Sequence, residues 1–176
     1  EKGFLHCDLL VIGSGPSGLI SAYIAGLSGA NVILVEEDYV FGGNINNEEV
    51  IISKLSGKEW VNFLITELKK LSNVRCMSRT CVIGMFDHGN FGVIETFDKA
   101  VNSKIDQMFW KITSKKTMLC TGAIERLIPF QNNDRPGIML SGSIRSYLNR
   151  WGVIVGKKVA IFTNNDDAYS TAKNLI

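Results

Sequence analysis

The first 36 residues carry two short apolar runs, separated by a glycine-rich turn and a stretch of small residues. Residues 9–13 and 32–35 are rich in leucine, isoleucine and valine, and each run is only long enough for a β-strand. Between them, residues 19–29 combine alanine, serine and glycine with apolar side chains, as in a helix that packs closely on a sheet. The pattern predicts a strand, a turn, a helix and a second strand.

The turn between the first strand and the helix consists of Gly13, Ser14, Gly15, Pro16, Ser17 and Gly18. Gly13 permits a tight turn, Gly15 lets the backbone approach a pyrophosphate, and Gly18 allows the helix to pack on the strand. The amides of this turn lie at a helix N-terminus, where free N–H groups and the helix dipole favour an anion. Pro16 suits the first helical turn, because no N–H is needed there. The position between a strand and a helix favours a dinucleotide fingerprint over an ordinary glycine-rich turn without a ligand.

An acidic residue, Glu36, ends the second predicted strand. Glu36 follows Gly18 by about as many residues as separate the last fingerprint glycine from the ribose-binding carboxylate in dinucleotide-binding folds. A carboxylate repels a 2′-phosphate, so NAD or FAD is favoured and NADP is disfavoured. The glycine pair Gly42 and Gly43 follows shortly afterwards and predicts a second loop close to the same phosphates.

The middle of the chain continues the alternation of elements. Residues 57–71 have apolar side chains at helical spacing and predict an amphipathic helix. Residues 74–77 predict a third parallel strand, which we expect beside the first strand in a doubly wound order. Three extended segments, with polar turns at 87–90 and 98–107 between them, then predict an antiparallel β-meander at about 80–114, with strands at 80–86, 91–97 and 109–114.

After the meander, residues 115–123 predict a short strand that ends in Thr121 and Gly122. The carboxyl end of a parallel strand faces the ligand crevice, so this pair is expected near the cofactor. Residues 141–150 predict a helix with Ile144, Tyr147 and Leu148 facing inward.

Residues 156–168 have the layout of a second strand and turn, but the turn contains two aspartates and no glycine. These carboxylates would cap the following helix and repel a diphosphate, so we expect no second nucleotide site. The fold class is therefore α/β: a Rossmann-like doubly wound parallel sheet with an antiparallel meander, followed by the start of a second Rossmann-like unit. Residues 1–130 are expected to form the dinucleotide-binding domain and 131–176 a connector with the first part of an inserted domain. One strand and one helix cannot bury a core, so the chain is expected to be part of a longer polypeptide.

Composition narrows the function further. The formal net charge is +2, which gives no strong field for nucleic acid or an anionic membrane. No apolar run approaches the roughly 20 residues that span a bilayer. The four cysteines show no C-x-x-C spacing and, with only two histidines, predict no metal site. Buried, reduced thiols in a cytoplasmic protein are the expected state of the cysteines.

Four further stretches resemble the α subunits of the heterotetrameric sarcosine oxidase family, within the glutathione-reductase-like two-dinucleotide-binding fold. The similarity runs from Cys7 to Ile176 and is most specific at residues 132–150; the other stretches are 79–88, 121–126 and 162–169. The resemblance implies oxidative demethylation of sarcosine to glycine with production of hydrogen peroxide, and transfer of the one-carbon unit to tetrahydrofolate. It also implies β, γ and δ partner subunits and a cytoplasmic location.

The resemblance further implies NAD in this segment, with FAD as the alternative, and FAD and FMN elsewhere in the complex. Amine oxidation then occurs at flavins held by or near the β subunit, so no catalytic residue is assigned to this chain. Carried over by position, the cofactor contacts are the turn from Gly13 to Gly18 with Ser14, Gly15, Pro16 and Ser17, and also Glu36, Glu37, Asp38, Gly43, Asn44, Val82, Thr121 and Gly122.

Several alternatives remain open for these residues and for the chain. Glu37 and Asp38 also fit a solvated acidic turn, and Val82 also fits the meander core, since its implied role uses only the backbone. For the chain, one alternative is an FAD-binding subunit of an amine or opine dehydrogenase. Another is an assembly module with an empty nucleotide crevice.

Overall fold

The structure is a computed structural model that describes residues 1–99 and 104–176. Part of the turn predicted at 98–107 lies outside the described residues. The chain divides into two compact units. The first comprises Glu1–Gly43 and Lys58–Gly122, and the second comprises Asn44–Gly57 and Ala123–Ile176. The domain boundary predicted near residue 130 stays a prediction.

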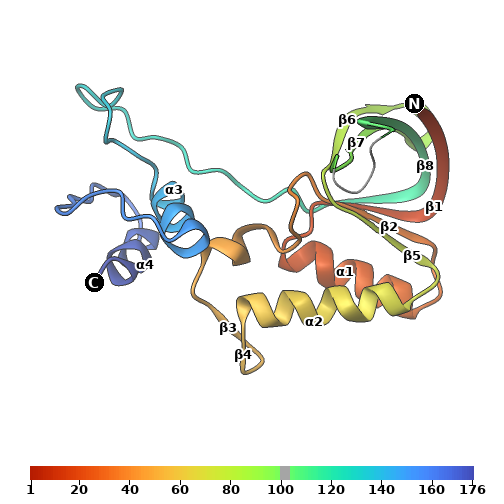
Figure 1. The fold of residues 1–176 in the computed structure, drawn as a ribbon, viewed down its shortest axis with the longest axis horizontal. Coiled ribbons are helices and arrows are strands. Elements are labelled where there is room, and N and C mark those ends of the chain that lie inside the picture. Colours follow the sequence, from red (N-terminus) through yellow and green to blue (C-terminus); the bar gives the residue numbers. More distant parts are fainter. Residues whose placement is uncertain (100–103) are drawn as a thin grey trace. The chain divides into compact units, whose positions relative to one another are not determined.

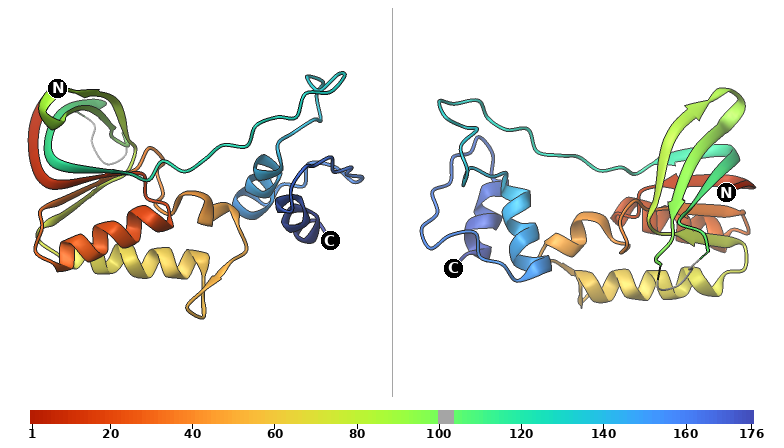
Figure 2. Two further views of the ribbon diagram at one scale, coloured as in Figure 1. Left: turned by 180° about the vertical axis from the view of Figure 1, so that it is seen from behind. Right: turned by 45° about the horizontal axis from the view of Figure 1, so that its top comes forward.

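The first unit is built on a six-stranded sheet with the order β5-β2-β1-β8-β7-β6 (Figure 1). Two helices, α1 and α2, lie along one side of its parallel strands, as both views of Figure 2 also show. The elements in chain order are β1 (Lys2–Ile12), α1 (Pro16–Leu27), β2 (Val32–Val35), α2 (Gly57–Lys70), β5 (Val74–Met77), β6 (Thr80–Phe86), η2 (Asp87–Gly89), β7 (Asn90–Thr96) and β8 (Gln107–Leu119). The expected α/β, Rossmann-like class is confirmed.

The position predicted for the third parallel strand is wrong. β5 pairs with β2 and not with β1, in a parallel register from Val32↔Val74 to Val35↔Met77. The place on the other side of β1 is taken by β8, which pairs with it in parallel from Lys2↔Phe109 to Ile12↔Leu119. The two crossover connections through α1 and α2 thus place β2 and β5 on one side of β1, and β8 pairs on the other side.

The two segments predicted at 109–114 and 115–123 form one continuous strand, β8. Its first half pairs antiparallel with β7 in the meander, while most of its length pairs in parallel with β1. The polar run around Lys115 resembles a break in the sequence, but its ammonium forms a 2.7 Å ion pair with Asp8 of the neighbouring strand. A polar residue on a solvated strand face keeps its backbone pairing, so polarity alone does not end the strand.

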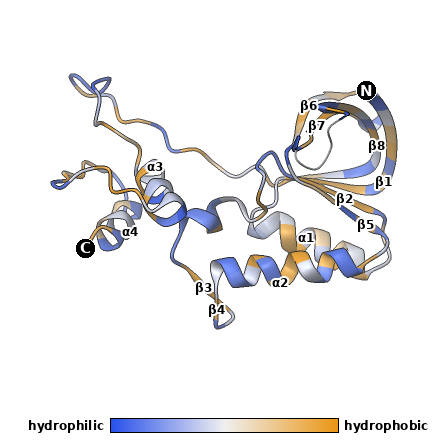
Figure 3. Cartoon of the chain, viewed as in Figure 1, coloured by the Kyte–Doolittle hydropathy of each residue, from blue (hydrophilic) through white to orange (hydrophobic). Residues whose placement is uncertain are grey.

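The core of the first unit lies between the parallel strands, the meander and the two helices. Figure 3 shows the hydrophobic colouring gathered on the strands, whereas α2 alternates between hydrophobic and hydrophilic. In α2 the buried side chains are Trp60, Val61, Leu64 and Leu68, at helical spacing. The central cluster consists of Cys7, Leu10, Ile33, Val35, Met77, Phe91, Val93 and Ile112.

The second unit contains little regular structure. Its elements are η1 (Gly43–Asn47), the two-residue strands β3 (Ile51–Ile52) and β4 (Leu55–Ser56), α3 (Ser141–Arg145), η3 (Ser146–Arg150) and α4 (Asp167–Asn174). The helix predicted at 141–150 is present, but its second half is a π-helix, and Tyr147 is exposed rather than inward. The buried residue of this helix is Arg145.

The strand predicted within residues 156–163 is absent, and this segment has no regular structure. A β-strand needs a neighbour for its backbone groups, and in the described residues no other strand pairs with this segment. The helix expected after the aspartate-rich turn does form, as α4, because its hydrogen bonds are local.

Candidate dinucleotide-binding site

Three loops that follow neighbouring parallel strands come together at the carboxyl edge of the sheet. They are the turn after β1, the segment from Glu36 after β2, and the residues after β8. Backbone hydrogen bonds link the edge: Gly13 N donates to Val35 O at 2.9 Å, and Cys120 N donates to Ile12 O at 2.7 Å. In open α/β sheets this edge is where ligands bind.

The outer glycines of the fingerprint are required by packing. Gly13 has φ +96°, and a Cβ on it would lie 2.3 Å from the carbonyl oxygen of Cys120. A Cβ on Gly18 would lie 1.9 Å from the carbonyl oxygen of Gly13. The roles predicted for these two glycines, a tight turn and close contact between helix and strand, agree with this geometry.

Gly15 differs from the other two glycines because, in the described part of the chain, no atom lies where its side chain would be. Its φ of −61° and ψ of −179° are open to any residue. A Cβ there would meet no atom within 4 Å. The fold itself therefore does not require glycine at position 15, and the space in front of it is available to a ligand.

This space lies at the N-terminus of α1, a 12-residue helix. Gly15 is its N-cap residue, Pro16 occupies the first helical turn, and no acidic residue lies in that turn. Pro16 and Ser17 are exposed. The positive dipole end of α1 thus has no acidic residue of its own first turn beside it, which suits a pyrophosphate.

Glu36 is buried, with 7% of its surface exposed. Its Oε2 accepts hydrogen bonds from the Ser14 amide at 2.8 Å and the Ser14 hydroxyl at 2.5 Å. Its Oε1 accepts one from the Asp38 amide at 3.0 Å. A carboxylate has about four acceptor positions, so roughly one remains on Oε1 for a ribose hydroxyl.

The loop with the predicted glycine pair touches the fingerprint. Gly42 N donates to the carbonyl oxygen of Ser14 at 3.1 Å and to its hydroxyl at 3.0 Å. Gly43 has φ +54°, and a Cβ on it would lie 3.1 Å from the Cα of Gly15. Gly43 thus belongs to the same cluster of residues. Asn44, predicted beside it, is exposed and belongs to the second unit.

Glu37 and Asp38 line a surface hollow of about 420 Å³ in the first unit. Arg79 also lines it, with φ +52° and its guanidinium carbon 5.3 Å from the centre of the Tyr39 ring. A backbone hydrogen bond joins the two segments that line the hollow, since Arg79 N donates to Asp38 O at 2.8 Å. The remaining lining residues are Cys81, Ile83, Ile94, Thr96 and Gln107.

Val82 packs against the central cluster, as expected for a residue of the meander core. It belongs to β6, the outermost strand of the sheet, and the pairing with β7 is irregular between Val82 and Gly84. Because an edge strand leaves one row of backbone groups without a strand partner, the proposed backbone role of Val82 stays compatible with the fold.

Thr121 and Gly122 follow the end of β8 and are exposed. Gly122 has φ +72°, and a Cβ on it would meet no atom within 4 Å. Like Gly15, it leaves open space beside its backbone. The structure therefore brings Thr121 and Gly122 to the same sheet edge as the fingerprint, next to Cys120 and Gly13.

The sequence assigned no role to the hydroxyl of Ser14 or to Arg79 and Tyr39. Ser14 is completely buried, and its hydroxyl is hydrogen-bonded to Glu36 and Gly42. A serine between two glycines resembles any polar turn residue, so nothing local marked it. Arg79 stands alone between two strands, and its proximity to Tyr39 depends on a contact across 40 positions of the chain.

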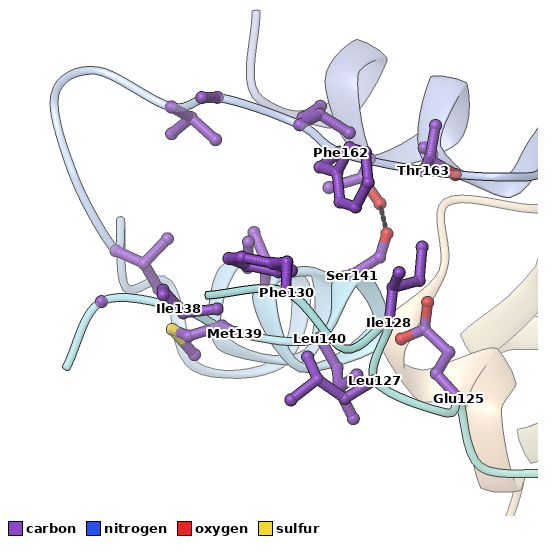
Figure 4. Close-up of a pocket in the computed structure, with 18 of the residues that line it drawn as sticks. Glu125, Leu127, Ile128, Phe130, Ile138, Met139, Leu140, Ser141, Phe162 and Thr163 are labelled. Atoms are coloured by element: carbon purple, nitrogen blue, oxygen red, sulfur yellow. Dashed lines mark hydrogen bonds between the residues drawn. The ribbon is translucent and has the colours of Figure 1, made fainter. Parts of the chain in front are cut away.

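A larger cavity of about 560 Å³ lies in the second unit (Figure 4). Its wall is mainly apolar, with Phe130 and Phe162 in edge-to-face contact at 5.6 Å between ring centres. Ser141 and Thr171 form a hydrogen bond at its border. Phe162 is 69% exposed, so this cavity is an open apolar surface. It contains none of the predicted site residues.

Other kinds of site receive no support from the described part of the chain. Residues 1–99 and 104–176 contain no group of three or more histidine, cysteine or acidic residues arranged for a metal ion. No helix in these ranges has the length and apolarity to cross a membrane. All four cysteines are free, and burial raises the pKa of Cys7 and Cys76 to about 11. Cys81 is exposed, contrary to the expected burial.

Comparison with known proteins places this site in a family. The α subunit of sarcosine oxidase from Rhizobium meliloti (strain 1021) is 41% identical over 99% of the chain, and the chain covers 18% of that relative. A subunit of the opine oxidase from Agrobacterium tumefaciens (strain Ach5) is 29% identical over 96% of the chain and 34% of the relative. The chain thus spans about a fifth of the length of its sarcosine oxidase relatives.

Among solved structures, L-proline dehydrogenase from P. horikoshii matches 99% of the chain with a TM-score of 0.81 and 26% identity, and 34% of that protein is covered. The family described as FAD dependent oxidoreductase matches residues 8–111, more than half of the chain. The chain is homologous to sarcosine oxidase α subunits and belongs to the FAD-dependent oxidoreductase family.

Proposed function

We propose that this chain is the dinucleotide-binding segment of an oxidoreductase that acts on CH–NH groups, of the sarcosine oxidase α-subunit type. The support comes from three sarcosine oxidase α subunits that are 35–41% identical over 97–99% of the chain. The opine oxidase and proline dehydrogenase relatives are likewise named for substrates that carry such a group. Oxidation of sarcosine, with transfer of its one-carbon unit to tetrahydrofolate, is the proposed reaction of the whole protein.

The single observation that carries the binding role is the environment of Gly15. Gly13 and Gly18 are explained by contacts within the chain, whereas Gly15 faces open space at a helix N-terminus without acidic residues. A pyrophosphate suits this place, because it accepts hydrogen bonds from amides and interacts favourably with the dipole. The ADP moiety then extends toward Glu36 after β2.

The residues of this site bind and orient a nucleotide; we assign no proton transfer to them. Glu36 accepts a ribose hydroxyl through Oε1, and its charge disfavours a 2′-phosphate. Glu37, Asp38 and the backbone of Val82 border the adenosine, while Thr121 and Gly122 lie toward the rest of the cofactor. The cofactor contact of Asn44 stays a prediction from the sequence. When bound, NAD or FAD supplies the redox-active ring, which the protein positions.

We propose NAD as the nucleotide held here, from the resemblance to sarcosine oxidase α subunits. FAD is the second candidate, and the match to the FAD-dependent oxidoreductase family favours it. Both share the ADP moiety, and the residues of the fingerprint contact that shared part. An FAD-binding subunit of an amine or opine dehydrogenase is the corresponding alternative function, supported by the opine oxidase relative.

The proposed assembly is a cytoplasmic heterotetramer with β, γ and δ subunits, in which FAD and FMN are held elsewhere. The support is that the relatives are named as α subunits, a name that implies further subunits.

The test is to purify the complete polypeptide that carries this chain, denature it, and identify the released nucleotide by mass. NAD supports the proposal, whereas FAD, with the yellow colour of a flavin, supports the alternative. If no nucleotide is released and neither NAD nor FAD raises the melting temperature, the chain is an assembly module with an empty crevice.

A further inference from the structure

The hydroxyl of Ser14 links the fingerprint turn to Glu36 and to the loop that carries Gly42. It donates to Oε2 of Glu36 at 2.5 Å and accepts from the amide of Gly42 at 3.0 Å. The backbone of Ser14 repeats both links, since its amide donates to Glu36 and its carbonyl accepts from Gly42. The side chain is fully buried, so water does not compete for these bonds.

These bonds determine which part of Glu36 is available. Both donors from Ser14 converge on Oε2, which turns this oxygen toward the fingerprint turn. Among the described residues, Oε1 accepts one hydrogen bond, from the amide of Asp38, and keeps an acceptor position. In the described chain, none of the ion pairs includes Glu36, so neutral donors alone stabilise this buried carboxylate.

The same hydroxyl holds the second glycine loop. Through Gly42, it holds the loop in which Gly43 lies so close to Gly15 that a Cβ on Gly43 would be 3.1 Å from the Gly15 Cα. Without the hydroxyl, Gly42 keeps the bond to the Ser14 carbonyl, but Glu36 loses one of its three donors. The larger consequence is therefore expected at the carboxylate rather than at the loop.

We infer that Ser14 is a positioning residue for nucleotide binding: its hydroxyl orients Glu36 so that Oε1 is presented to the adenosine 2′-hydroxyl. This inference rests on the proposed function and adds a residue through which Glu36 acts. A purely structural role would affect all nucleotides equally. The proposed role affects only nucleotides that carry a 2′-hydroxyl.

The test compares ADP with 2′-deoxy-ADP, because ADP is the part that NAD and FAD share. The complete polypeptide is freed of resident nucleotide, and the Kd of each probe is measured for the wild type, Ser14→Ala and Ser28→Ala. Ser28 is the matched control, because its hydroxyl donates to the carbonyl of Ala25 near the far end of α1. We expect Ser14→Ala to weaken ADP binding about tenfold, as for the loss of one hydrogen bond to a charged group, and 2′-deoxy-ADP less than twofold.

An equal loss for both probes, or no loss for either, overturns the inference while leaving the proposed function intact. If the wild type binds neither probe, the proposed function fails and the inference fails with it. Should Ser14→Ala not fold, Ser14→Cys is measured in the same way, because a thiol fills a similar volume but hydrogen-bonds weakly. The same difference between the two probes is expected for it.

Discussion

Substitution of Gly15 separates ligand binding from folding. The backbone of Gly15 suits any residue, and an added Cβ meets no atom of the chain within 4 Å. Gly15→Ala is therefore expected to change the free energy of unfolding by less than about 1 kcal/mol. The new methyl group occupies the space beside the backbone that a pyrophosphate needs. The affinity for the nucleotide is therefore expected to fall.

Gly15→Asp adds a negative charge at the same place. A carboxylate about 4 Å from a phosphate costs roughly 4 kcal/mol at an effective dielectric constant of 20, which corresponds to about a thousandfold in Kd. The nucleotide content of the purified protein, measured by mass after denaturation, is expected to fall below detection. Circular dichroism and the melting temperature without nucleotide should remain close to those of the wild type.

Gly156→Ala is the matched control, since Gly156 also has a free position for a Cβ, with the nearest atom at 3.7 Å, but belongs to the second unit. It is expected to retain nucleotide. Folded Gly15→Asp protein that carries the wild-type amount of nucleotide would refute the assignment of the pyrophosphate to this turn. A large loss of stability in Gly15→Ala would show that the glycine is needed for the fold instead.

Three further changes test the packing that supports the site. Gly18→Ala forces a methyl group against the Gly13 carbonyl and is expected to lower the free energy of unfolding by about 3 kcal/mol, measured by urea denaturation; an unchanged midpoint would contradict this packing. Arg145→Ala removes two ion pairs of 2.8 Å each, to Glu48 and Asp167, and is expected to speed hydrogen exchange of the amides in α3 and α4 while α1 stays protected. Unchanged exchange rates in α3 and α4 would contradict a stabilising role of these ion pairs. Alkylation of the native protein at pH 8 is expected to label exposed Cys81 before Cys7, because burial raises the pKa of Cys7 to about 11 and keeps its thiol protonated. Equal alkylation rates for the two cysteines would contradict the burial of Cys7.

The parts of the fold that depend on local interactions were predictable from the sequence. The helix from Pro16 forms where the glycine turn and the apolar pattern place it, and the helix at 57–71 forms for the same reason. The first two meander strands, β6 and β7, also agree with the prediction, because a short polar turn separates their apolar runs. The reach of β1 back to Lys2 was not predicted, because it depends on pairing with β8, more than 100 residues away.

The site shows the same division. The spacing from Gly18 to Glu36 identifies the ends of two adjacent strands, so both residues were predictable as candidates. The contacts of Glu36 were not predictable, because its hydrogen bonds to Ser14 form only when the two strands pair. Arg145 is a similar case: an arginine on a helix is usually solvated, yet this one is buried between Glu48 and Asp167.

The contrast between the two units follows from where hydrogen bonds are completed. In the first unit, β1 lies between two parallel partners, so the turn at its carboxyl end is held in place on both sides. The turn at Gly13, whose φ of +96° suits glycine, is therefore held in one conformation. Residues 156–163 have an apolar pattern of similar strength but no strand partner in the described residues, and they form no strand. A sequence pattern thus specifies a site only where the neighbouring strands that hold its loops are present.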